Sequence, residues 1–331
     1  MGDGAGISPE LMARLLALPG VIEQAEIVVI GDRRVLDEGA RIAGVTVPLA
    51  ATVTRIEDAR PRTGAPVLLD RGTLDPRSIR LGVASAEGGR FAMDNFRTAL
   101  TLAREGRFDA ICFTPFNKAA LKLAGNPYDD ELHFAADVLG HSGECSEFNV
   151  LENLWNARVT SHVPMSKVPS LLTVESIVAA LRLADASLRQ SGFARPRIAV
   201  AALNPHAGDG GNFGREEIDV IEPAVAEACA RQIDAIGPYP ADTVFLRAKR
   251  GECDAVMTMY HDQGQIAMKL MGFERGVTVL GGLPVPICTP AHGTAYDIAG
   301  KGVADPTATH RAFLQACAMG RTHALNTKKT A

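Results

Sequence analysis

The sequence predicts a mostly parallel, doubly wound α/β fold. The chain has 331 residues, of which 47% are hydrophobic and 22% are charged, so it can bury a sizeable core. Segments with helical periodicity alternate along it with short apolar segments that are typical of buried strands. Because single cores seldom grow beyond about 250–300 residues, this length indicates two domains or one large α/β unit.

The first expected elements lie in the N-terminal third of the chain. A helix is predicted from Ser8, which is a good N-cap residue, with Pro9 at the first helical position. Residues 26–32 (EIVVIGD) are apolar and predict a strand. The amphipathic pattern of residues 90–108 predicts a helix that leads into a strand at 109–115.

The same alternation continues through the second half of the chain. Residues 173–192 predict a helix that ends at a glycine, and residues 197–203 predict the strand after it. Residues 215–232 predict a further helix, adjusted at Pro223. An apolar strand ending at Met259 then follows, which completes the repeated helix-then-strand order.

The overall charge and the apolar segments exclude several classes of partner. The formal net charge is −4, which gives no electrostatic reason to expect nucleic acid or an anionic membrane. The sequence contains no apolar run near 18 residues and no signal-peptide pattern at its start. Its six cysteines form no CxxC pair and predict buried free thiols. We therefore expect a cytoplasmic protein that acts on a small molecule.

Three histidines follow expected strands at the point where each strand ends: His162, His206 and His261. A single histidine beside a strand is more often a structural residue than a metal ligand. However, the carboxyl ends of parallel strands face one common crevice, so three such histidines favour a shared site. Three neutral imidazoles can hold a divalent ion and leave coordination positions open for a substrate.

A glycine-rich segment, residues 208–217 (GDGGNFGREE), lies between an expected strand and an expected helix. Its backbone amides could bind the pyrophosphate of a dinucleotide at the start of that helix. The spacing differs from the dinucleotide-binding fingerprint, so a flexible loop is the alternative. The candidate cofactor-binding residues here are Gly208, Gly210, Gly211 and Gly214.

Two lysines, Lys118 and Lys269, closely follow apolar strands. They are either solvated surface charges or cations that face an anionic substrate.

Several motifs together resemble the 4-hydroxythreonine-4-phosphate dehydrogenase family of vitamin B6 biosynthesis, over nearly the whole chain. The most specific are Asn204-Pro205-His206-Ala207-Gly208 and Tyr260-His261-Asp262-Gln263-Gly264. The other segments that carry the resemblance are residues 2–10 (GDGAGISPE), Thr114-Pro115 with Lys118, residues 237–243 (GPYPADT) and residues 292–305 (HGTAYDIAGKGVAD).

This resemblance implies an isocitrate/isopropylmalate-dehydrogenase-like fold, in which two α/β domains flank a cleft. One domain would comprise residues 1–125 and 273–331, and the second, residues 126–272, would carry the histidines and the dimer contacts. The family also implies a homodimer with shared active sites, NAD as oxidant and one divalent metal per site. Zinc, cobalt, nickel and manganese are equally compatible with three histidines.

Individual residues carry the family's roles by position. Its metal-binding histidines fall on His162, His206 and His261, and its substrate-binding lysine falls on Lys269. His292 is a further candidate for cofactor binding. Asp262 and Gln263 would support the metal ligands or bind substrate.

The expected substrate pocket departs from the family. Counting without gaps, its substrate-binding His-Thr pair falls on Glu131 and Leu132, and His133 could substitute for the histidine. Its asparagine falls on Thr278 and its arginine on Ile287. Loss of the guanidinium removes a bidentate clamp for an anion, which predicts altered substrate recognition and poor turnover of 4-hydroxythreonine 4-phosphate.

The resemblance therefore implies metal-dependent, NAD-linked oxidation of a small phosphorylated hydroxy acid, with β-decarboxylation. Lys118 would transfer a proton and Asp242 would orient the site. Phosphorylated threonate or erythronate and a cis-dihydrodiol carboxylate are alternative substrates. A metal-dependent binding protein for sugar acids is the non-enzymatic alternative.

The start of the chain leads to a separate expectation. Members of this family begin with a short apolar strand before the turn that corresponds to Gly2–Gly6, whereas Met1 directly precedes that turn here. We expect an open strand edge beside the first helix. Either another segment covers this edge, or the natural protein begins upstream of Met1, which we favour because the turn itself is intact.

Overall fold

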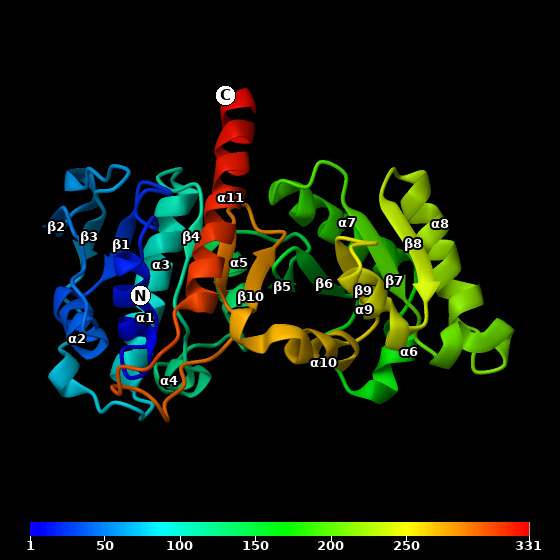
Figure 1. Cartoon of the computed structure of the whole chain (residues 1–331), viewed down its shortest axis with the longest axis horizontal. Coiled ribbons are helices and arrows are strands. Elements are labelled where there is room, and N and C mark those ends of the chain that lie inside the picture. Colours follow the sequence, from blue (N-terminus) through cyan, green and yellow to red (C-terminus); the bar gives the residue numbers. More distant parts are fainter. Residues whose placement is uncertain (331) are drawn as a thin grey trace. The chain divides into compact units, whose positions relative to one another are not determined.

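The computed structural model describes residues 1–330 and consists of two compact α/β units (Figure 1). Unit 1 comprises Met1–Ser142 and Leu283–Ala331, and unit 2 comprises Gly143–Gly282. The chain leaves the first unit once, after Ser142, and returns to it at Leu283, whereas the sequence analysis placed these boundaries at residues 125 and 272. Unit 1 extends further because helix α5 (Glu131–Leu139) packs against helix α3 (Ala86–Arg104).

Unit 1 contains one three-stranded parallel sheet and two parallel strands of the eight-stranded sheet. The three-stranded sheet has the order β1-β3-β2, with β1 at Val28–Gly31, β2 at Ala51–Val53 and β3 at Val67–Asp70. The two other strands are β4 (Ile111–Cys112) and β11 (Ile287–Pro290), which pair with each other. Besides α3 and α5, the α-helices of this unit are α1 (Ser8–Ala17), α2 (Arg33–Ala43), α4 (Lys118–Leu123) and α11 (Thr307–Thr330).

Unit 2 contains six strands in the order β10-β5-β6-β9-β7-β8. The last four are parallel, whereas β5 runs antiparallel to both of its neighbours. These strands span Val277–Gly281 (β10), Ser146–Leu151 (β5), Leu154–Arg158 (β6), Ala255–Thr258 (β9), Arg197–Ala201 (β7) and Asp234–Tyr239 (β8). The mostly parallel α/β architecture is thus confirmed.

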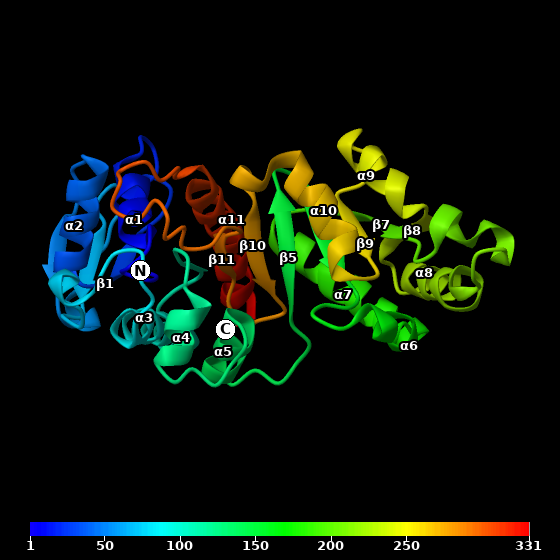
Figure 2. The same ribbon diagram turned by 90° about the horizontal axis from the view of Figure 1, so that it is seen from below.

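Helices cover both faces of the strands in unit 2 (Figure 2). Helices α9 and α10 lie on one face and α7 lies on the other, so the strands are buried on both sides. The α-helices of this unit are α6 (Val168–Leu171), α7 (Val174–Gln190), α8 (Glu222–Ala230), α9 (Ala241–Lys249) and α10 (His261–Gly272), and a π-helical turn at Glu217–Ile221 precedes α8.

Local capping explains where several helices begin. Helix α3 starts before the expected residue 90 because the Ser85 side chain accepts a hydrogen bond from the Gly88 amide. Ser8 is the first residue of α1 instead of its N-cap, and its hydroxyl donates to the carbonyl of Pro115. Pro223 lies in the first turn of α8, where a proline is tolerated.

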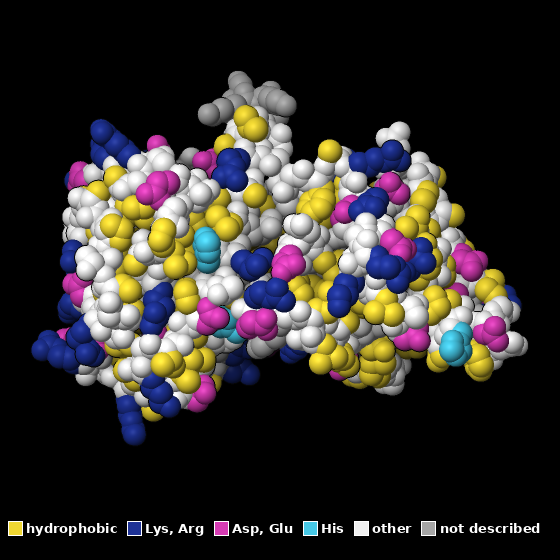
Figure 3. Space-filling model, viewed as in Figure 1, with side chains coloured by type: hydrophobic (Ala, Val, Ile, Leu, Met, Phe, Trp, Pro, Cys, Tyr) yellow, Lys and Arg dark blue, Asp and Glu magenta, His cyan; other side chains and the backbone are white. Residues whose placement is uncertain are grey.

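Positive and negative side chains are interspersed on the face shown in Figure 3. Among the described residues, no helix has the length and apolar character needed to cross a membrane. All six cysteines are free thiols, as expected, but only Cys253 and Cys288 are buried, and Cys229 is exposed.

Candidate functional site

The carboxyl edge of the parallel strands in unit 2 gathers most of the predicted catalytic and metal-binding residues. Strands β6, β9, β7 and β8 are neighbours in that order. The segments that follow them carry His162, His261, His206 and Asp242, respectively. Because parallel strands end at the same edge of a sheet, these four side chains share one edge of the unit.

His162 and His261 lie next to each other, with ring centroids 5.6 Å apart. Their loops are joined beyond the ends of β6 and β9, where the Val159 amide donates to the carbonyl of Thr258 over 2.9 Å. The Thr160 hydroxyl also donates to the carbonyl of Met259 over 2.8 Å. His162 has a φ of 53°, which is sparsely populated for residues other than glycine and indicates a locally imposed conformation.

Each residue of the segment His261–Gly264 has a distinct structural role. The Asp262 carboxylate lies 2.7 Å from Nδ1 of His261, which leaves Nε2 of that imidazole for another partner. Gln263 accepts a hydrogen bond from Met259 and donates one to the carbonyl of Ala202, so it ties the end of β9 to the end of β7. Gln263 thus fixes the two strand ends that precede His261 and His206.

Gly264 allows α10 to approach β6 closely. A Cβ atom at this position would lie 2.2 Å from Oδ1 of the buried Asn156, which no side chain could tolerate. The glycine thus sets the position of the first turn of α10 and, through it, the position of His261.

His206 belongs to a loop with an unusual backbone. Five consecutive residues, His206–Gly210, have left-handed conformations, with φ between 45° and 76°. Three of them are not glycine, so the surrounding structure must impose this conformation at a cost of about 1–3 kcal/mol for each residue. Such imposed strain is concentrated at functional sites.

The buried carboxylate of Glu217 anchors the beginning of this loop. Its Oε1 accepts hydrogen bonds of 2.8 Å from the amides of both Leu203 and Asn204, and its Oε2 accepts one from the Asn204 side chain. A Cβ at Gly208 would lie 2.7 Å from Oε2 of Glu217, and a Cβ at Gly214 would lie 2.4 Å from Nδ2 of Asn204. Packing therefore explains both glycines, and the loop is held rather than flexible.

The three histidines do not converge within one chain. The His206 ring packs near Phe213, with centroids 6.1 Å apart, and is exposed. The part of the chain that the structure describes contains no group of three or more His, Cys, Asp or Glu residues arranged to hold a metal. A single chain brings together two of the three imidazoles.

Lys269 and Thr278 lie in the neighbourhood of His261. Residues 261, 265 and 269 are each separated by four positions, so His261, Gln265 and Lys269 share one stripe of α10. Gln265 donates a short hydrogen bond to Oδ1 of Asn149, whose register partner on β10 is Thr278. Lys269 is exposed.

Unit 1 gathers a second set of predicted residues around the turn at Gly2–Gly6. The Ile7 amide donates to the carbonyl of Thr294, and the Asn117 amide group donates to the hydroxyl of Thr294 over 3.3 Å. Lys118, the first residue of α4, directly follows Asn117 and is exposed. These contacts bring the segments that carry Lys118 and His292 to the N-terminal turn, and Nδ1 of His292 lies 2.9 Å from the carbonyl oxygen of Gly293.

Asp3 and Tyr296 connect the same two segments. The Tyr296 hydroxyl donates a short hydrogen bond to the Asp3 carboxylate. Burial raises the pKa of Asp3, an effect that this hydrogen bond partly offsets, and burial together with Asp3 raises the pKa of Tyr296. The pair is therefore a buried structural link in unit 1.

The family follows from comparison with known proteins. A sequence profile described as "Pyridoxal phosphate biosynthetic protein PdxA" matches residues 23–316. This chain belongs to the PdxA family.

Individual members of the family are similar to this chain along nearly their whole length. A putative 4-hydroxythreonine-4-phosphate dehydrogenase 2 from Rhizobium meliloti is 59% identical, over 97% of this chain and 92% of the relative. A D-threonate 4-phosphate dehydrogenase from Salmonella typhimurium is 38% identical, over 92% of each chain. The crystal structure of 4-hydroxythreonine-4-phosphate dehydrogenase from Klebsiella pneumoniae has a TM-score of 0.83 and 35% identity, covering 97% of this chain and 96% of that one. The expected family and oxidoreductase class are confirmed.

The family resemblance does not carry over at every position. Leu132 is 5% exposed in α5 and Ile287 is 0% exposed in β11, so both side chains belong to the core of unit 1. We therefore no longer consider either a substrate-binding residue. Glu131 is the first residue of α5, and the side chain of His133 is exposed, with Nδ1 2.7 Å from the carboxylate of Asp130.

The site of this PdxA-family protein also contains a buried arginine that the sequence analysis missed. Arg158, at the end of β6, has a side chain that is 3% exposed. It donates to the Ser161 hydroxyl over 3.0 Å, to Oδ1 of Asn149 over 2.7 Å and to the Glu147 carboxylate over 3.3 Å. Burial lowers its pKa, and Glu147 partly offsets that effect.

This guanidinium connects the two histidine-bearing segments. Through Ser161 it holds the residue before His162, and through Asn149 and Gln265 it reaches the helix that begins with His261. The signal in the sequence was a charged residue at the end of a buried strand, four positions before a candidate metal ligand.

Proposed function

We propose that this protein catalyses NAD-linked oxidation of a secondary hydroxyl group in a small phosphorylated hydroxy acid, assisted by a divalent metal. The observation that carries the proposal is the His162–His261 pair, with His261 oriented by Asp262, at the carboxyl edge of the strands in unit 2. Relatives named for two phosphorylated hydroxy acids support the substrate class.

One chain provides two of the three protein ligands that a catalytic metal site needs. His162 and His261 supply adjacent imidazoles, and a carboxylate behind a histidine is the usual arrangement that fixes the ring and raises its basicity. A catalytic zinc-type site needs three protein ligands. When bound, a divalent cation would lower the pKa of a coordinated hydroxyl group. His162 and His261 would hold it, together with one further imidazole.

We infer that a homodimer supplies this further imidazole, as His206 of the partner subunit. Two observations support shared sites. His206 lies on the same strand edge as the pair but does not join it within the chain. Helix α10 also exposes Ile266 and Leu270, the latter at 85%, one helical turn apart on its outer side. Apolar side chains exposed next to a candidate site are typical of an interface.

The proposed cofactor is NAD, which would accept the hydride. The loop that carries Gly208, Gly210, Gly211 and Gly214 is the proposed binding region in unit 2, and His292 is a separate candidate for cofactor binding. Gly210 is exposed, and a Cβ atom built on it would have no neighbour within 4 Å. A ligand can therefore approach the backbone of this residue closely.

Lys118 and Asp242 are proposed to assist proton transfer and to orient the site. Lys118 is the first residue of α4 and Asp242 is the second residue of α9, and both side chains are exposed. If the substrate carries a carboxylate β to the new ketone, loss of carbon dioxide can follow oxidation. This decarboxylation forms part of the proposal.

Substrate recognition is proposed to rest on Lys269 and the neighbouring Thr278, and Glu131 and His133 are further candidates. Thr278 is a shorter hydrogen-bonding residue than the asparagine expected from the family. For that reason we propose D-threonate 4-phosphate as a second candidate substrate beside 4-hydroxythreonine 4-phosphate.

A substrate panel tests this proposal. Purified protein with NAD and zinc, cobalt, nickel or manganese would be given 4-hydroxythreonine 4-phosphate, D-threonate 4-phosphate, erythronate 4-phosphate and their unphosphorylated forms. We expect NADH formation only with phosphorylated acids, and lower turnover of 4-hydroxythreonine 4-phosphate than of the preferred acid. Tight binding of an acid without NADH formation would instead indicate a binding protein.

A further inference from the structure

Arg158 is a buried cation with more hydrogen-bond donors than acceptors around it. Its guanidinium donates to the Ser161 hydroxyl, to Oδ1 of Asn149 and to the Glu147 carboxylate. A guanidinium carries five N–H donors, so two of them have no acceptor among the residues that the structure describes. Buried polar groups normally have hydrogen-bond partners, and each exception needs a physical reason.

The carboxylate beside Arg158 compensates its charge only weakly. Glu147 approaches the guanidinium to 3.3 Å, whereas a strong charge-assisted hydrogen bond of this kind is about 2.7–2.9 Å long. The Glu147 side chain is 24% exposed, so water screens its charge, while the guanidinium is buried. Burial lowers the pKa of Arg158, and Glu147 offsets this effect only in part. A further anion beside the guanidinium would therefore be bound favourably.

The contacts of Arg158 place this cation next to the His162–His261 pair. The guanidinium binds the hydroxyl of the residue directly before His162 over 3.0 Å. On its other side, Oδ1 of Asn149 also accepts a hydrogen bond from Gln265, which lies one helical turn, about 6 Å along the axis, after His261. A small molecule whose hydroxyl group is bound at the pair can therefore place an acid group beside the guanidinium.

The face of the sheet that carries Arg158 is partly open to solvent. Asn149 pairs in register with Thr278 on one side and with Asn156 on the other, so these side chains share one face. Glu147 and Arg158, each two positions along their strands, belong to the same face. Glu147, Asn149 and Thr278 are half-buried. A ligand on this face can reach the guanidinium by displacing the Glu147 carboxylate.

We propose that Arg158 is a substrate-binding residue, whose guanidinium binds the carboxylate of the hydroxy acid in competition with Glu147. This inference rests on the proposed function, because it takes the hydroxyl group of the same acid to bind at the His162–His261 pair. A carboxylate is the anionic group that all the candidate acids share, and its planar geometry matches the fork of a guanidinium. Arg158 thus supplies the clamp for an anion that the core residue Ile287 cannot supply.

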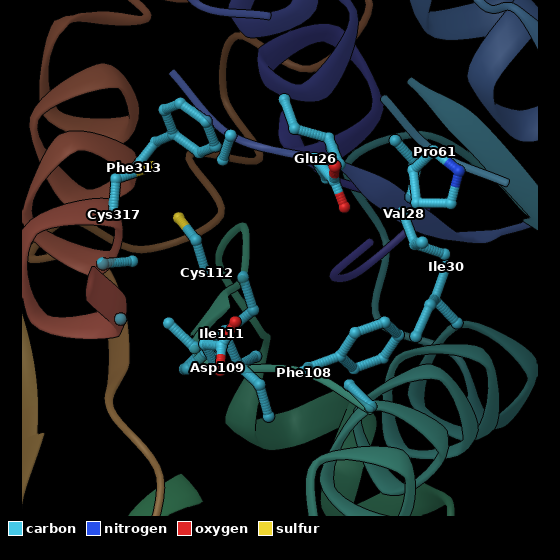
Figure 4. A pocket seen from close by; sticks show the side chains of 18 of the residues that line it. Glu26, Val28, Ile30, Pro61, Phe108, Asp109, Ile111, Cys112, Phe313 and Cys317 are labelled. Carbon is cyan, nitrogen blue, oxygen red and sulfur yellow. The ribbon is translucent and has the colours of Figure 1, made fainter. Parts of the chain in front are cut away.

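The cavity of unit 1 does not suit the same acid. This cavity has a volume of about 520 Å³, and its walls include Val28, Ile30, Ile111 and Phe313 (Figure 4). Burial raises the pKa of the Cys112 thiol, which also lines it, to about 12, because apolar surroundings disfavour a negative charge. A carboxylate would meet the same penalty in this cavity.

Binding measurements test the clamp separately from turnover. Titration calorimetry in excess zinc would compare D-threonate 4-phosphate and 4-hydroxythreonine 4-phosphate with their C1 carboxamides, in the wild type, Arg158→Lys and Arg158→Met. We expect the wild type to bind each acid at least about 10-fold more tightly than its amide, and both variants to lose most of this preference. The ratio of the two affinities is the readout, because a purely structural change weakens acid and amide alike.

A substitution of Glu147 should act in the opposite direction. Glu147→Gln removes the competing negative charge, so it should tighten binding of the acids by about 3-fold and leave the affinity for the amides unchanged. Glu144→Gln is the matched control, because it removes the carboxylate of an exposed ion pair with Arg182 and should change neither affinity.

Three results would overturn the proposal: equal loss of acid and amide affinity in Arg158→Lys, weaker binding of the acids by Glu147→Gln, or no binding of either acid by the wild type. A wild-type protein that binds the acids through Arg158 without forming NADH would contradict the proposed activity and still support the clamp.

Discussion

His162 and His261 lie with their ring centroids 5.6 Å apart, although 98 residues separate them along the chain. Strand order accounts for this distance, because β6 and β9 are paired neighbours and each histidine follows the end of its own strand. The arrangement provides two imidazoles without any local sequence motif that contains both.

Removing either imidazole should abolish tight metal binding. We expect His162→Ala and His261→Ala each to weaken zinc or cobalt affinity by at least about 100-fold, and Asp262→Asn by about 10–100-fold, because the carboxylate acts only through the ring. Titration calorimetry measures these affinities. His133→Ala is the matched control, since that exposed histidine lies in unit 1. Unchanged affinity in both alanine variants would exclude this pair as ligands.

Arg158 should act as a positioning residue. We expect Arg158→Met to lower the free energy of unfolding by about 1–3 kcal/mol, because it leaves buried hydrogen-bond acceptors unpaired. It should also weaken metal affinity, since Ser161 next to His162 loses its tether. Arg182→Met removes an exposed ion pair with Glu144 and should cost less than about 1 kcal/mol, with metal affinity unchanged. A loss of stability in Arg158→Met without any change in metal affinity would assign the residue a purely structural role.

The left-handed loop at His206 should depend on Glu217. We expect Glu217→Gln to destabilise the protein by about 2–3 kcal/mol, because the buried carboxylate accepts hydrogen bonds from two backbone amides and one side chain. Denaturant unfolding measures this change, and hydrogen exchange in residues 203–210 reports the loop directly. Glu227→Gln on the surface of α8 is the control. Wild-type exchange rates in the loop would show that another contact holds it.

Acid should weaken the ion pair between Arg197 and Asp254, which lies at the amino-terminal edge of the parallel strands. Arg197 hydrogen-bonds Asp254 through its backbone amide and its guanidinium. Burial alone would raise the pKa of Asp254, but these hydrogen bonds outweigh it, so the pKa is lowered. A lowered carboxyl pKa stabilises the fold above the unfolded value of about 3.9, and this stability is lost as pH falls through the folded value.

The difference in unfolding free energy between the wild type and Asp254→Asn should therefore be largest near pH 6 and shrink toward pH 3. A difference that stays constant over this range would show that the carboxylate contributes nothing through its charge.

The sequence was sufficient for the architecture because apolar periodicity reflects burial directly. The three strands expected before His162, His206 and His261 are present and parallel, so their carboxyl ends lie at the same edge of the sheet. Strand neighbours are set by tertiary packing, so the closer pairing of His162 with His261 was not predictable from spacing.

Errors arose where a side chain faces the core instead of the site. Leu132 and Ile287 were assigned to the substrate pocket by counting along the chain, which carries no information about the direction of a side chain. Arg158 was missed because periodicity alone does not reveal a buried polar network.

The most direct test of the proposed activity is NADH formation by the metal-loaded protein with D-threonate 4-phosphate or 4-hydroxythreonine 4-phosphate, compared with the His261→Ala variant. The proposal predicts NADH formation by the wild type with at least one of these acids. It also predicts loss of that activity after chelation and in His261→Ala, while the surface variant Arg182→Met should remain active. NADH formation that persists in His261→Ala or after chelation would contradict the central claim.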